Sequence, residues 1–225
     1  MNVAAVVPVK RLEKSKTRLS KVLSREEIVK LTLTMLADVL NALGSSTVNE
    51  VVVVSSDLNV QKFTVNYSVR FLREDGVGLN RAVEQASDWC MRHGVESSLF
   101  IPADVPLIVK DDINGVVKTC EEGNQVVISP SRSGGTNALL RKPAKVIPTF
   151  FGLRSFHRHV SLMVDMGIKF KVYDSPRIAL DVDSVEDLYS VFSIENASAT
   201  KEYLEERGIL ERILQLRGSQ ARPTR

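Results

Sequence analysis

Five cationic side chains stand within nine residues near the start of the chain, and together they offer the positive charge that a phosphate group needs. They are Lys10, Arg11, Lys14, Lys16 and Arg18. They follow an apolar run, residues 3–7, that ends at Pro8. A buried strand, a basic loop and a helix in this order are typical of phosphate sites in α/β proteins, because a helix N-terminus attracts anions and Lys and Arg add charged donors. The alternative is a solvated basic loop, or a patch for nucleic acid or membrane.

An aspartate, Asp104, stands between Pro102 and Pro106 at the end of another apolar segment. Proline fixes φ and removes a hydrogen-bond donor, so the predicted strand must end there. If this strand and the first are parallel, Asp104 lies on the same sheet edge as the basic loop. A carboxylate in that position is suited to hold Mg²⁺ against a nucleotide phosphate. The alternative is a turn aspartate that bonds to its own backbone.

Asp181 and Asp183 form a second acidic motif, which follows a predicted strand at residues 178–180. Residues two apart on a strand share a face, so both carboxylates could reach one ion. Asp183 with Glu186 also fits a helix cap, and Ser184 could serve as the cap instead. Asp181 has no such second role and is the stronger candidate for a ligand.

Three loops with glycine or hydroxyl residues precede predicted elements. Residues 73–80 include Gly78 and lead into a helix, where a ligand could meet the helix N-terminus. Residues 131–138 offer N–H and hydroxyl groups to an anion, although a surface hairpin is the simpler interpretation. Gly152 permits close backbone approach, and Ser155 is either a helix cap or a phosphate ligand. His157 and His159 are too close for a metal pair on one helix face, so we expect them at the surface or behind a site.

Length and composition suit a single α/β domain. The chain has 225 residues, 44% of them hydrophobic, and a net charge of +3. That small charge argues against a broad nucleic-acid surface, and no apolar run approaches the roughly 18 residues of a membrane helix. Cys90 and Cys120 are isolated thiols, and the N-terminus lacks a signal-peptide pattern. We therefore expect a reduced, cytoplasmic protein.

Hydrophobic periodicity predicts an alternation of strands and helices. The expected strands are residues 3–7, 50–56, 69–72, 98–101, 126–129, 168–173 and 178–180. The expected helices are residues 24–43, 79–93, 111–121, 155–166, a helix from 186 and one or two over 199–216, while residues 57–67 are ambiguous. Residues 1–216 are assigned to one nucleotide-binding domain, in which 196–216 form a helical extension, and 217–225 are expected to be a disordered basic tail.

In order, these motifs resemble the 2-phospho-L-lactate guanylyltransferase family, from biosynthesis of the deazaflavin coenzyme F-420. The similar segments are VPVK at 7–10, KTRL at 16–19, PADVPL at 102–107, TNA at 136–138, FG at 151–152, SF at 155–156, LDVD at 180–183 and DL at 187–188. The resemblance implies a Rossmann-like three-layer α/β sandwich with a mostly parallel mixed sheet, of the GT-A nucleotidyltransferase type. The first loop lacks the Gly-rich signature of sugar nucleotidyltransferases, which disfavours a sugar phosphate as substrate.

The same resemblance implies a reaction and its residues. GTP and 2-phospho-L-lactate, or phosphoenolpyruvate in similar members, would give a diphospho-guanosine product and pyrophosphate. The implied Mg²⁺ ligands are Asp104, Asp181 and Asp183, and the implied acceptor site is Thr136, Gly152 and Ser155. The implied nucleotide site is Pro8, Lys10, Lys16, Arg18, Gly78 and Asn80, with Lys10, Lys16, Arg18 and Asp104 as catalytic residues. A phosphate nucleophile has a second pKa of about 6, so no general base is needed.

Other readings remain open. A cytidylyltransferase or glycosyltransferase of the same fold would keep the carboxylates but prefer another base or acceptor, and a non-catalytic nucleotide sensor would bind without turnover. The apolar residues at 203–216 predict that the last helices pack on the body or on a second subunit, and the resemblance suggests a homodimer.

Overall fold

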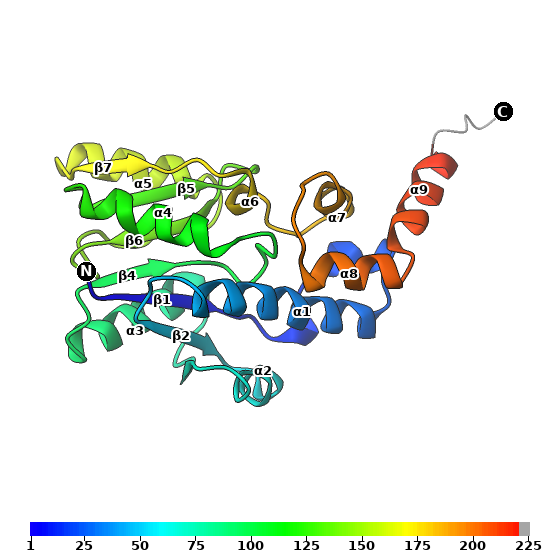
Figure 1. Ribbon diagram of the computed structural model, residues 1–225, viewed down its shortest axis with the longest axis horizontal. Helices are drawn as coiled ribbons and strands as arrows, with labels where there is room; N and C mark the ends of the chain where they lie inside the picture. The colour runs from blue at the N-terminus through cyan, green and yellow to red at the C-terminus, as the bar shows by residue number, and fades with distance from the viewer. Residues whose placement is uncertain (221–225) are drawn as a thin grey trace.

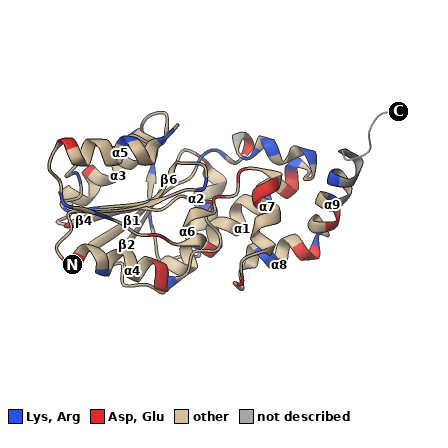
Figure 2. Ribbon diagram, turned by 90° about the horizontal axis from the view of Figure 1, so that it is seen from above, with Lys and Arg blue, Asp and Glu red and all other residues tan. Residues whose placement is uncertain are grey.

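The computed structural model describes residues 1–220 and has three layers, a seven-stranded sheet between two layers of helices (Figure 1, Figure 2). The strand order is β3-β2-β1-β4-β6-β5-β7. Among the described strands β6 is antiparallel to its neighbours β4 and β5, and the other pairs are parallel. The strands are β1 (Val3–Pro8), β2 (Glu50–Ser55), β3 (Arg70–Arg73), β4 (Ser97–Phe100), β5 (Val126–Pro130), β6 (Thr136–Arg141) and β7 (Phe170–Val172). The prediction of a mostly parallel mixed sheet is therefore confirmed.

The central strands are apolar on both sides because helices cover both faces of the sheet. One face packs against α1 (Arg25–Gly44), α2 (Leu58–Thr64), α4 (Lys110–Glu121) and α6 (Pro176–Ala179). The other face packs against α3 (Leu79–Arg92) and α5 (Ser155–Asp165). In β1, Val7 belongs to the first core and Val6 to the second, as the alternation of a strand requires.

A third apolar cluster lies beyond the sheet, to the right in Figure 1. It joins the first half of α1 to the short 3-10 helix η2 (Thr17–Lys21) and to the last three helices; another 3-10 helix, η1 (Leu12–Lys14), precedes η2. The last helices are α7 (Val185–Phe192), α8 (Ala199–Glu206) and α9 (Ile209–Gln220). Asp38 on α1 accepts hydrogen bonds from the backbone N–H groups of Ala199 and Thr200, both at 2.9 Å, which anchors the start of α8. The extension thus packs on the body of its own chain.

Two regions differ from the sequence-based expectation. Residues 178–180 were predicted as a strand, but Ile178 and Ala179 form the end of α6 and Leu180 is its C-cap. The helix begins here because the Ser175 side chain accepts a hydrogen bond from the Ile178 N–H and Pro176 occupies the first turn. Residues 217–220, expected in a disordered tail, lie within α9, and residues 221–225 lie outside the described part of the chain. The ambiguous segment 57–67 contains α2, and residues 131–135 form the β5–β6 hairpin loop.

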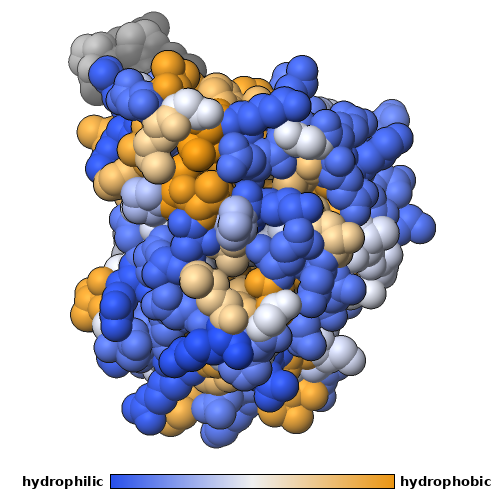
Figure 3. Space-filling model, turned by 90° about the vertical axis from the view of Figure 1, so that its left-hand side faces the viewer, coloured by the Kyte–Doolittle hydropathy of each residue, from blue (hydrophilic) through white to orange (hydrophobic). Residues whose placement is uncertain are grey.

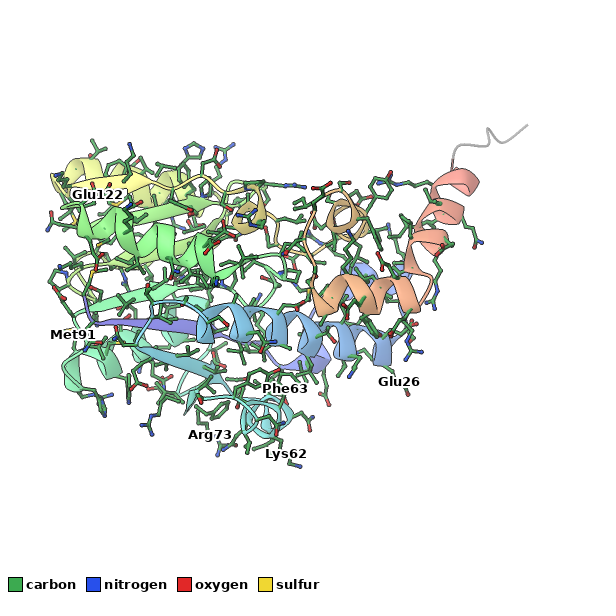
Figure 4. The ribbon with its side chains drawn as sticks, in the orientation of Figure 1. Glu26, Lys62, Phe63, Arg73, Met91 and Glu122 are labelled. Atoms are coloured by element: carbon green, nitrogen blue, oxygen red, sulfur yellow. The ribbon has the colours of Figure 1, made fainter. Side chains whose placement is uncertain are left out.

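Helices that cover a parallel sheet run opposite to its strands, so their N-termini lie at the carboxyl edge of the sheet. Figure 4 shows this polarity: Met91 near the end of α3 and Glu122 just after α4 lie at the left-hand edge, whereas Glu26 in the first turn of α1 lies far to the right. The left-hand end, where β1 begins, is mostly hydrophilic (Figure 3). Helix dipoles therefore favour anions at the right-hand edge, where the predicted site residues lie.

Candidate active site

Lys16 joins the two acidic motifs at the carboxyl edge of the sheet. Its Nζ lies 2.5 Å from Oδ1 of Asp183 and also donates to Oδ2 of Asp104. The Lys16 side chain is 6% exposed, whereas that of Asp183 is 56% exposed. The basic loop, the mid-chain aspartate and the late aspartate therefore meet as predicted, and we call Lys16, Asp104 and Asp183 the lysine–carboxylate group. In Figure 2, basic and acidic segments lie together between the sheet and α7.

The backbone holds Lys16 in an unusual conformation. Lys16 has φ 51° and ψ 36°, in the left-handed region that side chains other than glycine seldom adopt. Two side chains hold the backbone that precedes Lys16. The Arg25 guanidinium donates to the carbonyls of Leu12 and Ser15, at 2.5 and 3.1 Å, and Asp57 accepts from the Leu12 N–H at 2.8 Å. Strained residues persist where surrounding contacts over-determine them, and such positions concentrate at functional sites.

The charges of this group stabilise one another. Burial alone would lower the pKa of Lys16, but the attraction of Asp104 and Asp183 outweighs it and the pKa is raised. Burial alone would raise the pKa of Asp183, but Lys16, with smaller contributions from Lys10 and Arg18, lowers it. Opposite charges within hydrogen-bond distance favour both ionised forms. Lys16 is therefore a permanent ammonium and Asp183 a carboxylate at neutral pH.

Asp181 lies beside this group but has a different partner. The Nδ2 of Asn137 donates to Oδ1 of Asp181 at 3.0 Å and to the Ile178 carbonyl at 2.9 Å, and the Val182 N–H donates to the Asp104 carbonyl at 2.9 Å. The pKa of Asp181 is raised, first by burial and then by repulsion from Asp104 and Asp183, against the Asn137 hydrogen bond. The structure thus brings all three predicted carboxylates to the same edge of the sheet, near enough for their charges to repel.

A β-bulge breaks the regular alternation of side chains along β6. The register changes so that Ser129 faces Ala138 but Pro130 faces Thr136, which leaves Asn137 as the extra residue. A bulge re-aims side chains next to it. Asn137 accordingly reaches α6 on one face of the sheet, while Thr136 contacts α5 on the other.

Thr136 and Ser155, both predicted in the acceptor site, are hydrogen-bonded to each other and to His159. The Ser155 hydroxyl donates to Oγ1 of Thr136 at 3.2 Å, and Nδ1 of His159 lies 3.2 Å from the same oxygen. The backbone N–H of Phe150 donates to Nε2 of His159 at 2.9 Å. All three side chains are almost fully buried, so of the two positions expected for His159, at the surface or behind a site, the structure excludes the surface. We call Thr136, Ser155 and His159 the hydroxyl–histidine group.

The remaining predicted residues lie around these two groups. Lys10 and Arg18 are exposed on the basic loop, and Pro8 ends β1. Gly78 has φ 103° and precedes α3, and Gly152 has φ 126° in the loop before Ser155, both conformations that favour glycine. Asn80 bonds with both atoms of its amide to the backbone of Phe151, at 2.7 and 3.1 Å, and so ties the start of α3 to the loop of Gly152. Sequence reasoning missed Arg25, Asp57 and Asn137, whose partners are distant in the chain.

The residues suit a divalent cation by their chemistry. Mg²⁺ prefers carboxylate oxygen ligands. Asp104 and Asp183 already share one cationic group, and Asp181 lies near enough to both for their charges, after burial, to raise its pKa. Within residues 1–220, no three His, Cys, Asp or Glu side chains form a ready-made metal cage.

Comparison with known proteins places the chain in a family. Residues 3–222 match the family model described as "Guanylyl transferase CofC like". The phosphoenolpyruvate guanylyltransferase of Rubrobacter xylanophilus is 39% identical over 84% of this chain and 92% of its own, and the 2-phospho-L-lactate guanylyltransferase of Methanothermobacter thermautotrophicus is 36% identical over 91% and 90%.

Solved structures agree on the fold. A structure from Desulfovibrio desulfuricans, proposed to be a nucleotide-diphospho-sugar transferase, superposes with a TM-score of 0.80 over 96% of this chain and 98% of that one, at 19% identity. A cytidylyltransferase from Leptospira borgpetersenii superposes with a TM-score of 0.58 over 100% and 99%, at 17% identity. The fold is thus the nucleotidyltransferase type that the motifs predicted. By its sequence match the chain belongs to the CofC-like guanylyl transferase family and is a nucleotidyltransferase.

Proposed function

We propose that this protein joins GTP to 2-phospho-L-lactate or phosphoenolpyruvate and releases pyrophosphate, the step that the family carries out in coenzyme F-420 biosynthesis. An oxygen of the acceptor phosphate attacks the α-phosphorus of GTP, and the bond from that phosphorus to the β-phosphate oxygen breaks. The observation that carries this proposal is the meeting of two unlike groups at one sheet edge, a charged one that contains Lys16 for a triphosphate and a neutral hydroxyl one for a small acid.

The basic loop is proposed to bind the triphosphate. Lys16 is held at the centre by two carboxylates, and the exposed Lys10 and Arg18 flank it on the same loop. Charge-assisted hydrogen bonds to phosphate oxygens align the α-phosphorus and neutralise the charge that develops on pyrophosphate as it leaves. The acceptor phosphate is already ionised near neutral pH, because its second pKa is about 6, so alignment and charge neutralisation suffice.

Asp104, Asp181 and Asp183 are proposed to hold Mg²⁺ when the nucleotide binds. When bound, this ion would supply Lewis-acid stabilisation of charge on the phosphate oxygens. Pro8, Gly78 and Asn80 are proposed to lie along the nucleotide, and Thr136, Gly152 and Ser155 around the acceptor.

One assay tests the reaction. Pyrophosphate release would be measured with each of four nucleoside triphosphates and each of the two acids. We expect release with GTP and with one or both acids. Release with CTP, or with a sugar phosphate in place of the acid, would instead identify another transferase of the same fold, and binding without release would indicate a nucleotide sensor.

Assembly and location are also proposed. We propose a homodimer, in which Leu214, 50% exposed on α9, lies at the contact; a monomer in light scattering at micromolar concentration would reject it.

None of the helices in residues 1–220 has the length and hydrophobicity that a membrane crossing demands. We propose a cytoplasmic location, in keeping with the free, buried thiols of Cys90 and Cys120.

A further inference from the structure

His159 is buried at the centre of the proposed acceptor site, although no acceptor atom is assigned to it. Its side chain is 0% exposed, and it contacts the two parts of that site, Thr136 on β6 and the backbone of the loop at Phe150. It lies four residues after Ser155 on α5, so the two side chains share one helix face. The ring also packs edge-on against Phe151, with centroids 5.3 Å apart.

The hydrogen bonds of His159 leave its ring one arrangement of protons. A backbone N–H can only donate, so Nε2, 2.9 Å from the Phe150 nitrogen, must be an unprotonated acceptor. A neutral imidazole with a bare Nε2 carries its proton on Nδ1. The Nδ1–H therefore faces Oγ1 of Thr136, 3.2 Å away, with the Ser155 carbonyl as a second acceptor. Burial, with Arg141 and Arg158, lowers the pKa of His159 to about 4, which agrees with a neutral ring.

This arrangement also determines the direction of the Thr136 hydroxyl. A hydroxyl oxygen has two acceptor lone pairs and one proton. His159 donates to Oγ1 of Thr136, and so does the Ser155 hydroxyl, at 3.2 Å. A protonated Nδ1 cannot accept the Thr136 proton, and neither can the Ser155 hydroxyl while it donates to Thr136, so that proton must be donated to a third group.

We propose that His159 is a positioning residue that keeps Thr136 as a hydrogen-bond donor toward the anionic oxygens of the acceptor acid. The inference rests on the proposed function, since it names what Thr136 presents to the substrate. A donor fixed in advance binds a phosphate or carboxylate oxygen without reorientation, and it disfavours an ammonium group, which has no acceptor, at the same place. Phe150 and Ser155 belong to the same network, so His159 also links the two segments that surround the acid.

Two substitutions separate the halves of this role. In H159N, the amide N–H lies where Nδ1 lay and still donates to Thr136, but the Phe150 N–H loses its acceptor. In H159Q, the amide oxygen reaches the place of Nε2, while the donor to Thr136 is lost. We expect H159Q to raise KM for the acid about tenfold with KM for GTP unchanged, and H159N to stay within about threefold of wild type. His157, exposed on the same helix, gives the control H157Q, which should leave both KM values unchanged.

A measurement on the unmodified protein keeps the test independent of stability. The chain has three histidines, so ¹⁵N spectra of the labelled protein, assigned with H159Q, would report the His159 tautomer directly. We expect the neutral ring with the proton on Nδ1 at pH 7. A proton on Nε2, or an unchanged KM for the acid in H159Q, would overturn the inference. If the wild-type protein released pyrophosphate with neither acid, the proposed function would fail while the tautomer could still be read.

Discussion

The lysine–carboxylate group and the hydroxyl–histidine group share one edge of the sheet but differ in charge and burial. In the first, a buried Lys16 meets Asp183, which is 56% exposed, so water reaches one side of the pair. In the second, neutral side chains bond to one another and His159 is fully buried. Because water reaches Asp183, this carboxylate can move from Lys16 into solvent at modest cost when a phosphate takes its place. A buried neutral network changes little when a ligand arrives, because any unpaired polar group would be costly there.

The lysine–carboxylate group should respond most strongly to loss of one charge. Asp104→Asn removes one of the two carboxylates on Lys16 and one proposed Mg²⁺ ligand. We expect kcat to fall about a thousandfold, equivalent to about 4 kcal/mol, with little change in Tm. Asp181→Asn should behave similarly. Pyrophosphate release and thermal denaturation measure the two quantities.

The control is a second carboxylate–lysine pair away from the site. Asp88 on α3 lies 2.7 Å from Nζ of Lys145, and Asp88→Asn should leave kcat unchanged. Near-normal activity in both Asp104→Asn and Asp181→Asn would contradict the proposal that these aspartates bind Mg²⁺. It would also mean that the lysine–carboxylate group is no more sensitive to loss of a charge than the neutral hydroxyl–histidine group is.

The hydroxyl–histidine group should show itself in the pH dependence of stability. The pKa of His159 is lowered to about 4 from an ordinary 6.5. Below pH 6.5 His159 becomes protonated in the unfolded chain, whereas in the folded chain it stays neutral until the pH falls to about 4. The stability that the neutral ring contributes is therefore present above pH 6.5 and is lost as the pH falls toward 4, by roughly 3 kcal/mol.

Urea unfolding of wild type and H159N at several pH values isolates this effect, because other titrating groups contribute equally to both. The difference in free energy of unfolding should shrink steadily from pH 6.5 to pH 4. A difference that stays constant over this range would mean that His159 titrates normally. The pKa of Asp183 is lowered, so its pair with Lys16 persists over the same range.

Two arginines on the basic loop test whether position matters beyond charge. Arg18 adds to the lowering of the Asp183 pKa, whereas Arg11 is exposed and donates to Ser56 at 3.3 Å. Arg18→Ala should lower kcat/KM for GTP about tenfold, equivalent to about 1.4 kcal/mol, and Arg11→Ala should be nearly silent. Steady-state kinetics with GTP as the varied substrate compares them. Equal, small changes in kcat/KM for the two variants would mean that the basic loop is only a charged surface and does not bind the triphosphate.

Neighbouring residues at the start of α7 separate activity from stability. Ser184 caps this helix in a capping box with Asp187, whereas the side chain of Asp183 bonds to Lys16. Ser184→Ala should therefore lower the free energy of unfolding by roughly 1 kcal/mol and spare activity. Asp183→Asn should lower activity without that loss, in place of the mixed effect that a capping Asp183 would give. Denaturant unfolding and turnover, measured on the same preparations, separate the two roles. If Asp183→Asn lowered the free energy of unfolding and Ser184→Ala did not, Asp183 would be the residue that caps α7.

Local rules in the sequence determined much of the scaffold. β-branched runs specify the buried strands, Ser24 and Glu27 specify the start of α1, and the prolines around Asp104 specify where its strand ends. Since β1 and β4 are parallel, the basic loop and Asp104 had to share a sheet edge. Ser175 and Pro176 are also a local signal for the start of α6, but the apolar residues that follow them led to the prediction of a strand.

Tertiary structure alone decided which side chains meet. Lys16 finds Asp104 and Asp183 at separations of 88 and 167 residues, and Asn137 reaches Asp181 because a bulge places it on the same face of the sheet as its neighbour Ala138. Likewise, the spacing of Ser155 and His159 places them on one helix face, but the Phe150 and Thr136 bonds depend on how α5 docks on the sheet. Periodicity states which face of an element is buried, while strand order, register and helix docking choose its partners, and a hydrogen bond needs the partner to within a few tenths of an ångström.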